Sequence, residues 1–143
     1  NWQAIKEIKE ALSIPVIANG DIKTTEDAKD CLAITKADGI MIGRGSMGAP
    51  WLAGQIDSEL RGGPTLKTPN TKKKLEIARE QLLALVESKG LHGMLIARKH
   101  MNWTCRGFAG ASGLRHALMK ASTPKEAEDL INKQILISER IGE

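Results

Sequence analysis

The chain has 143 residues, a net charge of +4 and only two cysteines, and it opens at Asn1 rather than at a methionine. Nothing resembles a signal peptide, and no apolar run approaches the ~20 residues of a membrane span. Cys31 and Cys105 stand in no metal-ligand spacing, so we expect a reduced, cytoplasmic protein without a bound metal. The missing methionine leads us to expect a processed product or a piece of a larger protein.

The first 60 residues alternate between helical and strand patterns. Short, fully apolar strands are predicted at 14–18 and 39–43, between amphipathic helices at 1–12, 24–34 and 46–60. Strands of this kind are typical of a parallel sheet that helices cover on both faces. Two strands cannot close a sheet, so this segment is expected to be the end of a larger α/β structure.

Everything after a Gly, Pro and Thr-rich linker at 62–70 has a helical pattern. The first helix carries an apolar stripe and stops at Lys89–Gly90. A second covers 91–105, a third 112–121 and a fourth 123–141, where Thr123, Pro124 and Glu126 predict a capping box. We therefore predict an α/β portion at 1–61 and a four-helix domain at 71–143.

Polar and glycine residues follow both predicted strands at the point where each strand ends. Asn19, Gly20 and Asp21 follow the first, and Gly43 and Arg44 follow the second. Ligands gather at the carboxyl ends of parallel strands, where exposed N–H groups and an arginine can hold a phosphate. The pattern predicts a phosphate site, in which Asp21 caps the turn or the next helix rather than holding the anion. The alternative is that these are ordinary turn glycines and a surface arginine.

The second half of the chain contains a long basic stretch without acids. No Asp or Glu lies between Glu87 and Glu126, whereas seven Lys or Arg residues and all three histidines do. Such a stretch indicates an anionic partner, with nucleic acid the leading candidate, and the alternative is a solvated basic face.

On the predicted helix at 91–105, Arg98 falls inside an apolar stripe. We expect it to point into a cleft between domains, with a buried ion pair as the alternative, and we expect Trp103 to be a core residue. Several basic side chains in this region are candidates for contact with RNA. They are Arg98, Lys99, His100, Arg106, Arg115 and Lys120.

Four motifs together resemble one protein family. "PVIANGDI", "ADGIMIGRG", "GAPW" and the downstream "ARKHMNW" are similar to the carboxyl-terminal half of the tRNA-dihydrouridine synthases, specifically their bacterial B-type branch. The similarity is strongest over residues 14–52 and 96–103 and covers essentially the whole chain.

The resemblance implies the last two strands of an FMN-binding (β/α)8 barrel and a helical domain that grips tRNA. It implies reduction of the uracil 5,6 double bond in tRNA, with NADPH as the reductant. By match to the family pattern, the FMN phosphate and ribityl side would lie against Asn19, Gly20, Asp21, Gly43 and Arg44. The family's catalytic cysteine belongs to an earlier barrel segment that nothing here matches. We therefore assign no catalytic residue and expect the chain alone to be inactive.

Two other readings remain open from the sequence. One is a different phosphate-binding barrel, such as a dihydroorotate-dehydrogenase-like flavoenzyme, which leaves the basic helices unexplained. The other is a stand-alone RNA-binding helical module. The sequence does not indicate which tRNA uridine is modified or the oligomeric state.

Overall fold

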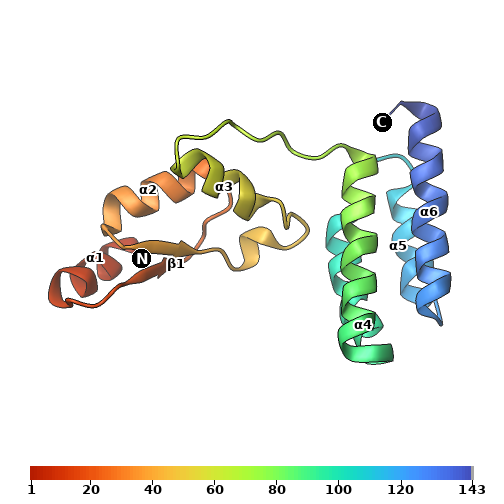
Figure 1. Ribbon diagram of the computed structural model, residues 1–143, viewed down its shortest axis with the longest axis horizontal. Coiled ribbons are helices and arrows are strands. Elements are labelled where there is room, and N and C mark those ends of the chain that lie inside the picture. The colour runs from red at the N-terminus through yellow and green to blue at the C-terminus, as the bar shows by residue number, and fades with distance from the viewer. Residues whose placement is uncertain (143) are drawn as a thin grey trace. The chain divides into compact units, whose positions relative to one another are not determined.

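The computed structural model describes residues 1–142, which form two compact units, Asn1–Thr68 and the chain from Pro69 onward (Figure 1). The division falls within the predicted linker, and each unit is described by itself. The elements in chain order are α1 (Trp2–Ala11), β1 (Ile17–Asn19), α2 (Thr25–Thr35), β2 (Gly39–Met41), the 3-10 turn η1 (Arg44–Ser46), α3 (Leu52–Leu60), α4 (Thr71–Thr104), α5 (Ala111–Lys120) and α6 (Pro124–Ile141).

The first unit is a pair of parallel strands with helices on one face. β1 and β2 pair from Ile17–Gly39 to Asn19–Met41, as the apolar strand pattern predicts. Ala18 is fully buried, because it points into a core that all three helices of the unit share. That core consists of Ala18, Ile22, Ala28, Cys31, Leu52 and Ile56, with Trp2 and Ile5 packed against it.

The opposite face of these strands is not covered by the described helices of this unit. The expectation that helices cover both faces is therefore wrong for the described residues. Ile17 is 58% exposed and Met41 52% exposed, so apolar side chains of both strands face away from the helices. Right-handed crossovers place their helices on one side of a parallel sheet as long as successive strands are added at the same edge. The exposed face is therefore a consequence of the strand–helix order.

Local capping explains where α2 begins. The Thr24 side chain accepts a hydrogen bond from the Asp27 N–H at 3.0 Å, and the Asp27 carboxylate accepts from the N–H groups of Lys23 and Thr24 at 2.9 Å. These hydrogen bonds hold the pKa of Asp27 below its usual value, the bond from Lys23 being the largest cause. Asp27 and Thr24 thus cap α2, which was one of the two roles expected for Asp21.

A second carboxylate, Asp38, ties the strands to α1. One of its oxygens accepts hydrogen bonds from the Lys9 ammonium and the Val16 N–H, both at 2.7 Å. The Lys9 contact is the main cause that lowers the pKa of Asp38, followed by the Val16 hydrogen bond. Asp38 therefore connects a helix, the entry to β1 and the entry to β2.

We expect this link to make the first unit sensitive to acid. Because the folded state lowers the pKa of Asp38, its stabilisation is present above the unfolded value near 3.8 and is lost as the pH falls through the lower folded value. Asp38→Asn should lower the unfolding temperature of the unit at pH 7. On acidification to pH 3, the unfolding temperature of the variant should fall less than that of the native chain. Thermal unfolding at pH 7 and at pH 3 measures both effects. Asp30→Asn, which removes an exposed carboxylate of α2, should change neither; an equal loss in the two variants would contradict the prediction.

In the second unit, α4 bends sharply at Gly90. Its φ of 59° and ψ of −142° are non-helical and are accessible essentially only to glycine. Beyond the bend, the backbone at Gly93 lies against the Leu85 carbonyl, so the two arms of α4 run side by side. The predicted helix end at Lys89–Gly90 coincides with this bend. The four predicted helices correspond to the two arms of α4, α5 and α6.

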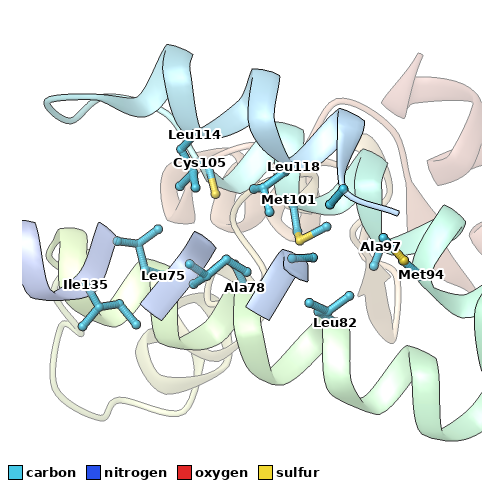
Figure 2. Packing of buried hydrophobic residues seen from close by; sticks show 13 residues of the cluster. Leu75, Ala78, Leu82, Met94, Ala97, Met101, Cys105, Leu114, Leu118 and Ile135 are labelled. Atoms are coloured by element: carbon cyan, nitrogen blue, oxygen red, sulfur yellow. The ribbon is translucent and has the colours of Figure 1, made fainter. Parts of the chain in front are cut away.

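The core of the second unit joins all three helices (Figure 2). Leu75, Ala78 and Leu82 are buried on the first arm of α4, as the predicted stripe requires, and face residues of the second arm, α5 and α6. On the second arm the buried residues include Met94, Ala97 and Met101, and Cys105 is buried just beyond its end. Burial raises the pKa of the Cys105 thiol to about 12, so this cysteine is a neutral core group at physiological pH.

Candidate functional site: a pocket at the strand ends and a basic helical surface

The loops after β1 and β2 come together around one pocket of about 570 Å³. Asn19, Gly20 and Asp21 reach it from the first loop, and Gly43 and Arg44 from the second. All five residues proposed from the sequence for cofactor binding therefore line the same hollow. Ile22, Lys23 and Gly45 complete its lining.

The first loop has an unusual backbone that a side chain outside the loop supports. Gly20 has a φ of 134° and Asp21 a φ of 54°, so the chain turns through left-handed conformations directly after β1. The indole N–H of Trp2 donates to the Gly20 carbonyl oxygen at 2.9 Å. This role was not assigned to Trp2 from the sequence. The sequence offered one signal for it, because the N–H of a buried or half-buried indole usually needs a hydrogen-bond acceptor nearby.

The second loop is a tight turn that packs directly on the first. Its Ser46 hydroxyl donates to the Gly43 carbonyl oxygen at 2.9 Å, which stabilises η1. A Cβ atom at position 45 would collide with the Ile22 carbonyl oxygen, so only glycine allows this approach of the two backbones. Gly45 was absent from the predicted site, and its role depends on a contact between loops that local sequence does not reveal.

The pocket contains more positive than negative side chains. Arg44 and Lys23 contribute cations, and Asp21 contributes the one carboxylate of the lining. The closest approach of Arg44 Nη2 to Asp21 Oδ1 is 3.9 Å, and these side chains are 88% and 79% exposed. Such an exposed pair is weak, so the Arg44 guanidinium remains available to an anion. Glycines at 20, 43 and 45 leave room for that anion beside the backbone.

The helical unit presents three of the six candidate RNA contacts as exposed cations. Lys99, Arg106 and Lys120 are exposed, and Arg106 Nε donates to the Asn102 carbonyl oxygen at 3.1 Å. The candidate His100 is half-buried and lies next to Lys99 on α4. Lys99 is thus exposed on the second arm of α4, Arg106 just beyond the end of α4, and Lys120 at the end of α5.

Arg98 and Arg115 instead bind the ends of helices. Arg98 Nη2 donates to the Ala121 carbonyl oxygen at 2.7 Å, just beyond α5, and Arg115 Nη1 donates to the Cys105 carbonyl oxygen at 2.8 Å, just beyond α4. Cations favour helix C-termini, where carbonyl groups lack partners. The partner of Arg98 is thus a backbone carbonyl of its own unit.

Within residues 1–142 no helix is long and apolar enough to cross a membrane. In the same range, no three His, Cys, Asp or Glu side chains gather in a way that could hold a metal ion.

The two units define a class of protein. Parallel strand–helix units have a pocket suited to an anion at the carboxyl ends of their strands, and a basic helical unit follows them in the chain.

Comparisons with known proteins give the family. The model of the dihydrouridine synthase (Dus) family matches residues 1–140. A probable tRNA-dihydrouridine synthase 1 of Synechocystis is 46% identical over 134 residues, which are 94% of this chain and 38% of that protein. The tRNA-dihydrouridine synthase B of Pasteurella multocida is 41% identical over 126 residues, 87% of this chain and 38% of that protein. The chain belongs to the dihydrouridine synthase family, which confirms the resemblance seen in its motifs.

The chain spans about two fifths of the length of the curated relatives that it matches, 38% in Synechocystis and 40% in a probable synthase of Rickettsia bellii. The activity of a whole synthase therefore comes to this chain only as a proposal.

Proposed function

We propose that the chain is the carboxyl-terminal part of a cytoplasmic, FMN-dependent tRNA-dihydrouridine synthase, and that it contributes one wall of the cofactor site and the tRNA-binding helices. The observation that carries the proposal is the pocket in which the loops after two consecutive parallel strands meet. In a (β/α)8 barrel, loops at this position commonly bind a phosphate group. The names of the relatives support the choice of tRNA as the substrate.

The residues of the pocket suit the phosphate end of FMN. The Arg44 guanidinium can bind two phosphate oxygens at once, and Lys23 adds a second cation. Gly20 and Gly43 allow the phosphate to approach the backbone, and Asn19 can bind a hydroxyl of the ribityl chain. Asp21 repels a phosphate, so its place in this proposal is beside the ribityl hydroxyls.

In this proposal the bound flavin, kept reduced by NADPH, supplies the electrons that reduce the uracil 5,6 double bond. The chain itself binds and orients: its loops hold the phosphate, and its helical unit holds tRNA. Lys99, Arg106, Lys120 and His100 would lie near phosphates. Arg98 and Arg115 would add the N–H groups that they do not use on helix carbonyls. No residue of this chain is assigned to proton transfer, so the isolated chain should be inactive.

A chimaera tests this proposal. This chain replaces the matching part of the Synechocystis relative, and the purified product is examined for bound flavin and for dihydrouridine formation in tRNA. We expect a yellow, active protein. A folded chimaera without flavin or activity would contradict the proposal.

We expect Arg44→Ala in this chimaera to weaken FMN binding about tenfold to a hundredfold, because charge-assisted hydrogen bonds contribute about 1.5–3 kcal/mol. Arg44→Lys should recover only part of the loss, because an ammonium cannot bind two oxygens in one plane. Fluorescence titration with FMN gives the affinities. Arg61→Ala removes an exposed arginine paired with Asp57 outside the pocket and should leave the affinity unchanged. Equal losses in Arg44→Ala and Arg61→Ala would indicate a general charge effect.

A further inference from the structure

Trp103, on the second arm of α4, lies outside the core of the helical unit. Met94 and Met101 are buried in the core of the helical unit. At 100° per residue, Trp103 lies nearly opposite both of them on the helix. It is half-buried and does not belong to the core cluster or to the side chains packed against that cluster. The expectation that Trp103 is a core residue is therefore wrong.

A histidine holds this indole in place. The ring centroids of His100 and Trp103 lie 5.5 Å apart and their planes meet at 88°, an edge-to-face arrangement. Such pairs are favourable and restrict the rotation of the indole. The perpendicular contact leaves at least one face of the indole outside the pair.

The surroundings of the indole are positive. Lys99 is exposed one helical turn before Trp103, and Arg106 is exposed just beyond the end of the helix. The sequence between Glu87 and Glu126, to which these residues belong, contains no Asp or Glu. Proteins commonly bind unpaired nucleotides with aromatic rings next to cations. Any base can stack on such a ring, and the cations attract the phosphates.

We propose that Trp103, oriented by His100, is a stacking platform for an unpaired base of the RNA substrate, while Lys99 and Arg106 bind the adjacent phosphates. The inference rests on the proposed tRNA function and names one point of contact within it. The relatives that the chain resembles are named as tRNA-dihydrouridine synthases, which favours RNA over a protein partner.

The test separates stacking from ionic contacts by their dependence on salt. Affinities of the full chain for unmodified tRNA and for a single-stranded RNA oligonucleotide are measured across a salt series. Trp103→Ala should weaken binding about fivefold to a hundredfold at every salt concentration, with the slope unchanged. Trp103→Phe should retain most of the affinity. Lys99→Ala should weaken binding and reduce the slope by about one, because it removes one phosphate contact.

Leu136→Ala is the control, because it truncates an exposed apolar side chain of α6, and it should bind RNA as the native chain does. Unchanged affinity in Trp103→Ala, beside a weakened Lys99→Ala, would overturn the stacking platform and leave the tRNA function standing. A Trp103→Ala chain that unfolds far below the native temperature would show that the ring packs against protein, which also overturns it. If the folded native chain binds no RNA, the proposed tRNA contact fails and the platform with it.

Discussion

Gly93→Ala should destabilise the helical unit more than any other single-methyl addition among its helical glycines. A Cβ atom at position 93 would collide with the Leu85 carbonyl oxygen and would lie 3.0 Å from the Val86 nitrogen. Both obstacles are backbone atoms, so rotation of a side chain cannot relieve them, and the two arms of α4 must separate. Separation opens the core in which Leu82 faces Met94. We expect a loss of about 3 kcal/mol or more in the free energy of unfolding.

The measurement is thermal or urea unfolding followed by helical circular dichroism. A loss of 3 kcal/mol corresponds to a fall of roughly 10–25 °C for a unit of this size. Gly113→Ala is the matched control, because it lies in α5 of the same unit and a Cβ there meets nothing within 4 Å. Relief of glycine's backbone entropy should stabilise that variant by about 0.5–1 kcal/mol. Similar unfolding of both variants would show that the arms of α4 can separate without cost.

Local sequence patterns predicted the elements whose determinants are themselves local. Thr24 is the N-cap of α2 and forms a capping box with Asp27. The Thr123 hydroxyl caps α6 as predicted, accepting from the Glu126 N–H at 3.2 Å. The reciprocal bond differs, because the Glu126 carboxylate accepts from the Ser122 N–H rather than from the cap residue. Each of these interactions spans only three or four residues, so a short window of sequence contains the information.

Which face of the second α4 arm is buried could not be predicted in the same way. Leu91 and Leu95 are the two leucines of this arm, but Leu91 is 70% exposed and Leu95 53% exposed. The buried stripe instead runs through Met94, Ala97 and Met101. The bend at Gly90 brings the backbones of the two arms close together at Gly93, which favours small residues on the side facing the neighbouring arm. Hydrophobicity alone ranks leucine above alanine, and only the tertiary contact reverses that order.

Only part of the candidate pocket could be predicted from the sequence, because some contacts that shape it join residues far apart in the chain. Residues that follow strands are visible in sequence, and the rule that parallel strands end at one edge brings their loops together. Trp2 and Gly45 were missed because they act through partners far along the chain, the carbonyl groups of Gly20 and Ile22. Arg98 and Arg115 were assigned to RNA from their charge, whereas the structure shows that each also closes a helix end.

Gly45→Ala should damage the pocket at the contact between its two loops. The added Cβ would collide with the Ile22 carbonyl oxygen and would lie 3.0 Å from the Ile22 carbonyl carbon and 3.3 Å from the Lys23 Cα. All three are backbone atoms, so the η1 turn must move away from the first loop. That movement displaces Arg44 from the residues at the end of β1 with which it lines the pocket.

If this pocket holds the FMN phosphate, Gly45→Ala in the Synechocystis chimaera should bind FMN at least about tenfold more weakly, a loss of about 1.4 kcal/mol. Gly54→Ala is the matched control in the same unit, because a Cβ at this position of α3 meets nothing within 4 Å. It should bind FMN as the native chimaera does, and both variants should remain folded by circular dichroism. Native FMN affinity in a folded Gly45→Ala protein would show that the spacing of the two loops does not determine phosphate binding. Since Gly45 adds no charge and no hydrogen-bonding side chain, a loss in this variant would identify loop geometry, rather than the Arg44 charge alone, as a requirement for the cofactor.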